Sequence, residues 1–277
     1  MYNYFKRNFL KKLQGYEVNL KKIYAFFVFN PFFLTLKGQD TITNRTDTDG
    51  FGSQFQNIIA TAVFAELNKK FVYTPFKAMG HNYDNDPDFI QKKEELINFI
   101  GNFELNTNEK THQQNYSRSF FDNNIDRCAK TSILKKIKTI FRLNKKYQDY
   151  FSPDYFNVAV HIRRFNEHDN RTEGTNTSLN YFLKTIKKIE QFEHNKKKII
   201  FHVYSQGNIK KFQRLKKLEN VVFHLNESLE TSFASMVFAD TLVMSASSFC
   251  YAAALISDGI ILYHPFWHNP LPHWIFL

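Results

Sequence analysis

The sequence contains few of the residues that mark several large protein classes. Of its 277 residues, only 2 are Cys, 9 are Gly and 7 are Pro. Two thiols cannot build a disulfide framework or a four-thiolate zinc site, and the low glycine and proline contents exclude collagen-like and linker-like chains. With 43% hydrophobic and 23% charged residues, the chain as a whole is neither disordered nor a coiled coil. We predict a globular protein of one large domain or two modest ones.

Long hydrophobic runs are also missing. The strongest apolar stretch near the start, residues 23–36, is interrupted by Asn30 and Pro31 and is shorter than the roughly 20 residues that a spanning helix needs. We interpret it as buried strand. Lys, Arg, Gln and Glu are scattered through the first 22 residues, so no signal peptide is evident. We therefore expect no transmembrane segment and a cytoplasmic protein, soluble or peripheral to a membrane. The secretory lumen is the alternative location.

Basic residues exceed acidic ones, 37 against 26, which gives a net charge of +11. Such an excess attracts phosphate-bearing partners: nucleic acid, a membrane surface or a nucleotide-linked substrate. Much of the charge lies in short lysine runs, at residues 11–12, 135–136 and 196–198, where amphipathic segments begin or end. This placement favours a solvated face.

The second half of the chain alternates between two hydrophobic patterns. Short apolar runs at residues 157–162, 199–204, 221–225, 241–245 and 260–263 predict strands. Between them, helical spacing predicts helices at residues 179–189, around Phe212 and Leu215, at 233–238 and at 248–256. This alternation predicts a parallel sheet covered on both faces, that is, a Rossmann-like domain.

The first half is less regular but also reads as α/β. A helix is predicted to begin at the glycine-containing loop of residues 49–54 (DGFGSQ), and residues 71–74 form the next strand. Residues 81–130 carry little strand signal, so helices and long loops are expected there. We predict a domain boundary near residues 151–153, with an N-terminal α/β domain at 1–150 and a C-terminal domain at 151–277.

The first motif with chemical content is His161-Ile-Arg163-Arg164, directly after a predicted buried strand. In open α/β sheets the carboxyl ends of the strands form the ligand-binding edge. Guanidinium groups that leave a buried strand there suit a diphosphate, because each donates two parallel hydrogen bonds. The alternative is a strand that ends in solvated arginines.

Two further motifs also precede helices. In residues 245–249 (SASSF), hydroxyls and backbone N–H groups gather at a helix N-terminus, which favours phosphate. The alternative is simple N-capping by Ser247 or Ser248. In the loop of residues 49–54, the glycines permit close backbone approach to a ligand. That loop lacks the third glycine of the dinucleotide fingerprint and the lysine of a P-loop, so an NAD site or a kinase-like site is poorly supported.

Taken together, the three motifs resemble those of the fucosyltransferase superfamily, which includes α-1,2-, α-1,6- and protein O-fucosyltransferases. That family carries a G-x-G-x-Q-like loop near the start, an H-x-R-R-x-D motif in the middle and an A-D-x-x-x-x-x-x-S-S motif near the end. The corresponding stretches here are residues 50–54, 161–166 and 239–248. The resemblance extends over residues 50–257, most of the chain.

The resemblance implies a GT-B fold, in which two Rossmann-like domains with parallel sheets face a cleft, residues 1–150 being the acceptor side. It implies an inverting, metal-independent transfer of fucose from GDP-fucose to a hydroxyl of a glycan or glycoprotein. The expected partners are the nucleotide sugar and that acceptor; no nucleic acid and no further cofactor are expected. Arg163 would contact the diphosphate and stabilise the leaving nucleotide, supported by His161 and Arg164. The other donor-binding residues implied by position are Gly50, Gly52, Ser53, Gln54, Asp240, Ser247, Ser248 and Phe249.

The sequence departs from the family pattern in the loop that follows the arginines. Asn166 stands where the family usually has Asp. An inverting displacement also needs a base near the acceptor hydroxyl, and the same loop supplies Glu167, His168, Asp169 and Glu173. We favour Glu173 and Asp169 as the catalytic carboxylates.

Three alternatives stand beside this interpretation. A transferase of the same fold could use another donor, such as UDP-xylose. Asp84-Asn85-Asp86 matches the D-x-D pattern with which a different transferase fold binds a divalent metal, although a solvated loop is the preferred reading. The protein could instead be a basic binder of nucleic acid or of an anionic glycan, without catalysis.

Aromatic residues are concentrated at the end of the sequence, in residues 264–268 (HPFWH) and 272–274 (PHW). They could form a platform on which sugar rings of an acceptor stack. Our preferred interpretation is a terminal segment packed on the sheet.

Overall fold

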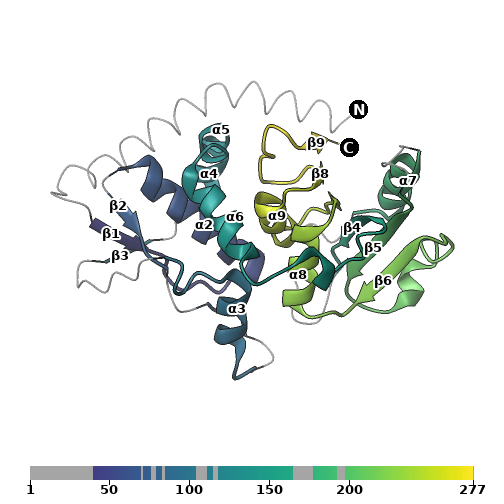
Figure 1. The fold of residues 1–277 in the computed structure, drawn as a ribbon, viewed down its shortest axis with the longest axis horizontal. Helices are drawn as coiled ribbons and strands as arrows, with labels where there is room; N and C mark the ends of the chain where they lie inside the picture. Colours follow the sequence, from purple (N-terminus) through teal and green to yellow (C-terminus); the bar gives the residue numbers. More distant parts are fainter. Residues whose placement is uncertain are drawn as a thin grey trace. The chain divides into compact units, whose positions relative to one another are not determined.

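The structure, a computed structural model, describes residues 40–69, 71–75, 79–82, 85–103, 111–114, 118–164, 177–191 and 197–276. Thr41–Leu277 form one compact unit (Figure 1). The division of the chain at residues 150 and 151 therefore stays a prediction, and the apolar run of residues 23–36 lies outside the described residues. Within the described part of the chain, no helix has both the length and the apolar character needed to cross a membrane.

The second half forms a six-stranded sheet with the order β6-β5-β4-β7-β8-β9. Every described pair in it is parallel, so the carboxyl ends of all six strands lie at one edge. The predicted parallel α/β architecture is confirmed. The strands are β4 (Phe156–Ile162), β5 (Ile199–Ser205), β6 (Val221–Leu225), β7 (Thr241–Val243), β8 (Ile260–Tyr263) and β9 (Ile275–Phe276).

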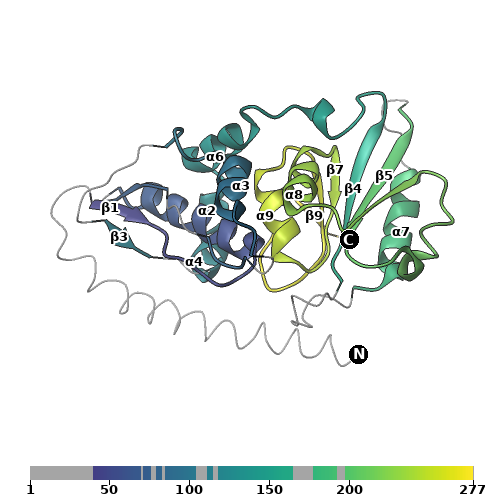
Figure 2. The same ribbon diagram turned by 90° about the horizontal axis from the view of Figure 1, so that it is seen from below.

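Side chains of β4 alternate between the two faces of this sheet, as the pleat requires. Val158, Val160 and Ile162 belong to a fully buried apolar cluster with α7 (Leu179–Glu190). His161 points to the opposite face, where its ring centroid lies 5.7 Å from that of Phe249 on α9 (Ser248–Ile256). Figures 1 and 2 show α7 on one side of the sheet and α8 (Leu229–Phe238) with α9 on the other.

The predicted lysine-rich helix between β5 and β6 is wrong. The chain there forms a single 3-10 turn, η2 (Ile209–Phe212), followed by further turns. Phe212 and Leu215 are both fully buried. A spacing of three residues places two side chains on one side of a tight 3-10 turn, so this short segment covers the sheet without a regular α-helix. The lysines of the segment are exposed, as are Lys135 and Lys136, in line with the solvated face that was predicted.

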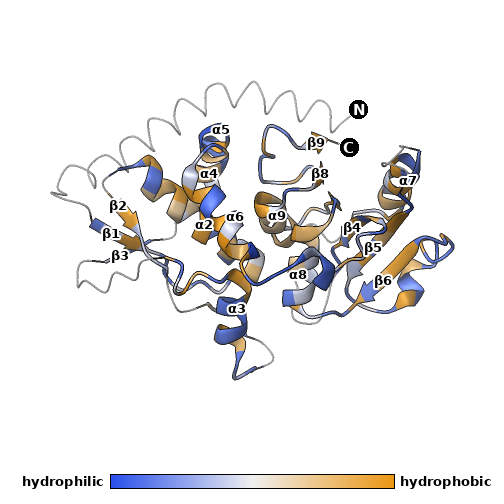
Figure 3. Ribbon diagram, viewed as in Figure 1, coloured by the Kyte–Doolittle hydropathy of each residue, from blue (hydrophilic) through white to orange (hydrophobic). Residues whose placement is uncertain are grey.

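In the first half, α2 (Phe51–Leu67) packs beside a three-stranded sheet with the order β2-β1-β3. Fifteen of its residues are buried, Phe51 to Ala65, because α9, α6 and α4 contact it in addition to β2. Figure 3 shows hydrophobic residues, in orange, along much of α2. The surrounding elements are β1 (Asp40–Thr43), β2 (Phe71–Tyr73), α3 (Phe89–Ile97), β3 (His112–Gln113), α4 (Arg118–Asn123), α5 (Ile125–Cys128), α6 (Ser132–Arg142) and η1 (Tyr147–Asp149).

Candidate functional site

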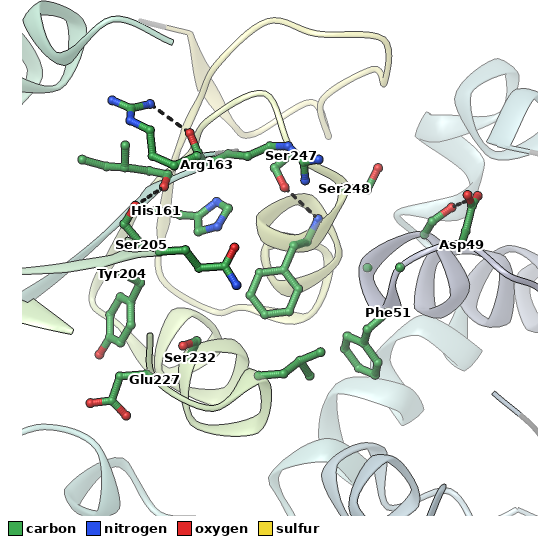
Figure 4. Close-up of a pocket in the computed structure, with 18 of the residues that line it drawn as sticks. Asp49, Phe51, His161, Arg163, Tyr204, Ser205, Glu227, Ser232, Ser247 and Ser248 are labelled. Carbon is green, nitrogen blue, oxygen red and sulfur yellow. Dashed lines mark hydrogen bonds between the residues drawn. The ribbon is translucent and has the colours of Figure 1, made fainter. Parts of the chain in front are cut away.

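A cavity of about 750 Å³ lies at the carboxyl edge of the six-stranded sheet (Figure 4). All three motifs identified in the sequence line it: residues 50–53 at the start of α2, residues 161–164 at the end of β4, and residues 247–249 at the start of α9. These segments are far apart in the chain, so the fold brings them together. The other lining residues are Asp49, His81, Tyr204, Ser205, Gln206, Glu227, Leu229, Ser232 and Trp267.

His161 reaches the cavity as a neutral side chain. Burial, together with the charges of Arg163 and Arg164, lowers the pKa of His161 to about 3. Its Nδ1 lies 3.0 Å from the hydroxyl of Ser245, which also accepts a hydrogen bond from the backbone N–H of Arg163 at 3.3 Å. At neutral pH, His161 therefore carries one ring N–H and no charge. A group with so low a pKa is a poor general base.

Arg163 and Arg164 are both half-buried, so the strand does not end in solvated arginines. Arg164 donates through Nη1 to the carbonyl oxygens of Arg163, at 2.9 Å, and of Thr177, at 3.2 Å. These bonds stabilise the backbone around the cavity. In Figure 4 the side chain of Arg163 extends along the cavity toward Ser247. Arg163 is thus the arginine that faces a ligand most directly.

The start of α9 forms the next part of the wall. Ser247 is the N-cap of this helix, because its hydroxyl accepts a hydrogen bond from the N–H of Phe249 at 3.3 Å. The capping alternative considered for Ser247 is therefore correct, and it leaves the other first-turn N–H groups at the positive end of the helix dipole. The thiol of Cys250 donates to the carbonyl oxygens of Ser245 and Ser247 at 3.3 Å and anchors this turn from inside the core.

The start of α2 faces α9 across a very short distance. A Cβ on Gly52 would lie 2.5 Å from the backbone N and Cα of Phe249. The glycine thus allows two helix N-termini to approach each other, which is a different role from the ligand approach that the sequence suggested. Asp49, just before α2, accepts a hydrogen bond from the hydroxyl of Ser53 at 2.8 Å and places a carboxylate on this side of the cavity.

Two residues predicted to bind the donor do not line the cavity. The amide of Gln54 is bonded to the backbone of Asp49 and of Gly80, and so ties two loops together. Asp240 precedes β7 and therefore lies at the amino edge of the sheet, opposite the cavity. Its carboxylate accepts from the N–H of Asn157 at 2.7 Å and from the hydroxyl of Tyr147 at 2.8 Å. The geometry gives both side chains structural roles.

Glu227 lines the cavity and was missed by sequence reasoning. It is the last of four polar side chains that contact one another in sequence across the sheet: Asn157, His202, His224 and Glu227. The Nε2 of His202 donates to the side-chain oxygen of Asn157, since the Nδ2 of Asn157 is used as a donor elsewhere. The Nδ1 of His202 therefore accepts from the Nε2 of His224, at 3.0 Å. The Nδ1 of His224 then faces Glu227 at 3.5 Å. Burial, and secondly His224, lowers the pKa of His202 to about 4.

A sequence signal for Glu227 was available. It comes two residues after the predicted strand at 221–225, at the same sheet edge as the arginines. Polar residues at that edge are candidates for ligand contact in any open parallel sheet.

The two tryptophans at the aromatic end of the chain differ in burial. Trp274 is buried against Tyr251 and Tyr263, and β9 joins the sheet beside β8, as the preferred interpretation predicted. Trp267, by contrast, is 48% exposed and lines the cavity.

Several predicted residues lie outside the described part of the chain: Asn166, Glu167, His168, Asp169, Glu173 and Asp84. Asp86 is described, and its carboxylate is engaged by Lys92 at 2.8 Å and by the N–H of Asp88 at 3.0 Å. The hydrogen bond from Lys92 is the main reason why the pKa of Asp86 is lowered. Asp86 does not line the cavity.

Neither a family model nor a curated protein sequence matches the chain, but solved structures do. NodZ α-1,6-fucosyltransferase co-crystallised with GDP aligns with a TM-score of 0.48 and 12% identity, over 83% of this chain and 97% of that one. NodZ from Bradyrhizobium aligns at 0.45 and 12%, over 80% and 93%. A mutant of Arabidopsis thaliana FUT1 in complex with GDP aligns at 0.46 and 13%, over 87% and 74%. These are fucosyltransferases, the family that the sequence motifs resemble.

Proposed function

We propose that the protein is a glycosyltransferase that moves fucose from GDP-fucose to a hydroxyl of a glycan or glycoconjugate, with inversion and without a metal ion. One observation carries the proposal. The half-buried Arg163 and the N-termini of α2 and α9 converge on one cavity, although they come from distant parts of the chain. A guanidinium beside two helix N-termini is an arrangement suited to a diphosphate.

The same groups suit the chemistry of the leaving group. As the bond between the sugar carbon and the phosphate oxygen breaks, negative charge grows on the nucleoside diphosphate. Arg163, Ser248 and the first-turn N–H groups of α9 are fixed beforehand by the sheet edge, so they stabilise that charge without rearrangement. Arg163 would then supply the charge that a divalent metal supplies in other transferases.

The second half of the reaction needs an acceptor and a base. The acceptor oxygen attacks the sugar carbon on the face opposite the phosphate, a new C–O bond forms, and the hydroxyl proton passes to a carboxylate. Asp169 and Glu173 remain the candidates proposed from the sequence. Asp49 is the candidate that the structure adds, because it lies on the α2 side of the cavity, across from Arg163 (Figure 4).

Glu227 favours guanine over uracil as the base of the donor. Guanine presents N1–H and N2–H side by side, and one carboxylate accepts both. Uracil presents a single N–H between two carbonyl groups, which repel a carboxylate. Glu227 follows β6, three strand positions from β7 and the start of α9, where the phosphates would lie. A UDP-linked donor is the second candidate, and the following experiment separates the two.

The test is calorimetric binding of GDP, UDP and GDP-fucose, each with EDTA and with Mn²⁺, together with donor hydrolysis. We expect GDP and GDP-fucose to bind in EDTA. Arg163→Ala should weaken binding about 10- to 100-fold, because a charge-assisted hydrogen bond is lost. Arg214→Ala is the matched control, since Arg214 is exposed, bonds to Asn180 and lies outside the cavity.

Three outcomes would contradict parts of the proposal. Binding of UDP but not of GDP would show that the donor is a UDP-sugar instead of GDP-fucose. Binding that requires Mn²⁺ would direct attention to Asp84 and Asp86. No nucleotide binding, together with RNA or DNA binding that falls steeply with salt, would favour the basic binder instead.

A further inference from the structure

We propose that Trp267 is the stacking platform for the sugar ring of the acceptor at the β8 end of the cavity. The inference rests on the proposed function and adds to it the position and chemistry of the acceptor subsite. The starting observation is that a tryptophan with 48% exposure lines a cavity, whereas the other tryptophan, Trp274, is buried.

The indole of Trp267 is held by a buried relay. Its Nε1–H donates to the Nε2 of His268 at 3.1 Å, and the Nδ1 of His268 lies 3.3 Å from the carboxylate of Asp122. An indole nitrogen can only donate, so Nε2 of His268 must be unprotonated and its proton must lie on Nδ1, facing Asp122. His268 is only 3% exposed, so water does not compete for these bonds.

The loop that carries the indole is anchored at the two residues that follow Trp267. Asp122 accepts from the backbone N–H of Asn269 at 3.1 Å, and Tyr251 donates to the carbonyl oxygen of Asn269 at 2.6 Å. Tyr263 donates to the carbonyl oxygen of His268. A ring held in this way binds a partner without losing much side-chain entropy.

The position of Trp267 along the sheet edge indicates which substrate it meets. The cavity extends from Glu227, after β6, to Trp267, after β8. Four inter-strand steps of about 4.8 Å place these two strands about 19 Å apart. Arg163 at β4 and Ser247 after β7 lie between them. If the base lies at Glu227 and the phosphates at Arg163, the transferred sugar and its acceptor lie toward Trp267.

The chemistry of the indole fits a sugar ring. Its only polar hydrogen is already bonded to His268, so what remains for a ligand is the apolar face of the ring. A pyranose presents C–H groups on its faces and hydroxyls around its rim. Such a ring can therefore cover the indole while its hydroxyls stay hydrated or reach polar neighbours.

The first experiment measures glycan binding on a broad glycan array in the presence of GDP. We expect Trp267→Ala to weaken binding of the recognised glycans about tenfold, and Trp267→Phe to retain most of it, because an aromatic face remains. GDP affinity, measured separately by calorimetry, should stay within about twofold of wild type in both variants. Thermal unfolding of both variants checks that the fold is kept, because either change removes the indole donor of the buried His268.

The outcomes separate this inference from the proposed function. Unchanged glycan binding in Trp267→Ala, or no bound glycan on the array, with GDP binding intact, would overturn the inference alone. Failure of the wild type to bind any nucleotide would overturn the proposed function first.

A second measurement distinguishes the acceptor from the donor. The fluorescence of Trp267 is obtained as the difference between wild type and Trp267→Phe, and its quenching by acrylamide is recorded. We expect the array-selected glycan to reduce quenching at least about twofold and GDP alone to leave it unchanged. Equal protection by GDP alone would assign the ring to the nucleotide and overturn the inference.

Asp122 is a positioning residue in this scheme, and it can be tested as one. Asp122→Ala removes the acceptor for His268 and should increase the rotational mobility of the Trp267 signal, with a rise in acceptor KM and little change in GDP affinity. Asp122→Asn keeps one of the two oxygen acceptors that His268 and Asn269 use, and should restore part of the wild-type behaviour. Equal mobility in wild type and Asp122→Ala would overturn the relay.

Discussion

His161 is held without charge in the wall of a cavity assigned to an anion. The side chain is 9% exposed and lies beside two guanidinium groups, and both facts disfavour the imidazolium form. The positive charge for a diphosphate therefore comes from Arg163 and the helix dipoles, while His161 contributes a neutral hydrogen bond. The sequence motif alone left open whether His161 would bind as a donor or act on a proton.

This neutrality should appear in the pH dependence of stability. In the unfolded chain His161 takes up a proton near its ordinary pKa of 6.5, whereas in the folded protein it does so only near 3. The unfolded state thus binds more protons between these values, and stability falls as the pH decreases through this window. From pH 7 to pH 5 the expected loss attributable to His161 is about 2 kcal/mol.

The measurement is urea unfolding of wild type and His161→Asn at pH 8, 7 and 5. The variant should lose about 2 kcal/mol less than wild type between pH 7 and 5. Between pH 8 and 7, where the imidazole is neutral in both states, the two proteins should change alike. His202, whose pKa is also lowered, is present in both proteins and contributes equally to the pH dependence of their stability. Parallel curves down to pH 5 would refute a neutral His161.

Residue types explain which site residues could be predicted. Arg163, Ser247 and Ser248 carry a recognisable pattern at the ends of predicted elements, and all of them line the cavity. Glu227 is marked only by its place just after a predicted strand, and Trp267 carries no local pattern that separates it from ordinary surface residues. That the two residues line one cavity depends on the order of strands in the sheet, which local periodicity does not encode.

At the scale of elements, the site depends on how closely α2 and α9 approach. A Cβ at residue 52 would meet the backbone of Phe249, and backbone atoms cannot turn aside as a flexible side chain can. Around this point Phe51, Phe233 and Phe249 are packed ring against ring, at centroid distances of 5.0 to 6.4 Å. These three packed rings therefore stabilise the close contact between α2 and α9 beside the cavity.

Gly52→Ala should separate the two helices. We expect a loss of about 3 kcal/mol in the free energy of unfolding, typical of overpacking against rigid neighbours, and GDP binding weakened beyond detection. Thermal unfolding and calorimetry measure the two effects. Gly101→Asn is the control, because Gly101 has φ +81° with no atom within 4 Å of a Cβ, and Asn tolerates that conformation. If Gly52→Ala had the same free energy of unfolding as Gly101→Asn, the close contact between α2 and α9 would not contribute to stability.

The elements of the second half were predictable because their hydrophobic patterns are clean. The short apolar runs of β4 and β5 predict buried strands, and the helical spacing of Phe182, Ile186 and Ile189 predicts one buried face of a helix. The failure at η2 has a physical reason, since Phe212 and Leu215 satisfy either a 3-10 or an α turn. In α2 the buried residues surround the whole helix and include polar ones such as Gln56 and Thr61, so the apolar spacing predicted a helix but not its contacts.

At the scale of the whole molecule, charged groups connect segments far apart in the chain. Lys93 on α3 pairs with Glu230 on α8, and Lys138 and Arg142 on α6 both pair with Asp258, each at 3.1 Å. Arg142 also donates to the carbonyl oxygen of Ile256 at 2.8 Å. Such long-range pairings place the first-half helices against the α8–α9 layer. These ion pairs could not be predicted from the composition. Only the order of the three motifs suggested that distant segments of the chain share one site.

The order of strands also has a thermodynamic consequence. Strands β6 and β8 are four inter-strand steps apart, about 19 Å, so changes at the β6 end and at the β8 end of the cavity should not interact. In kcat/KM, the free-energy costs of Glu227→Ala and Trp267→Ala should add in the double variant to within about 0.5 kcal/mol. A coupling energy well above about 1 kcal/mol would show that the two ends communicate. If they do not, donor preference and acceptor preference can be exchanged separately, by selection or by design, on the same sheet.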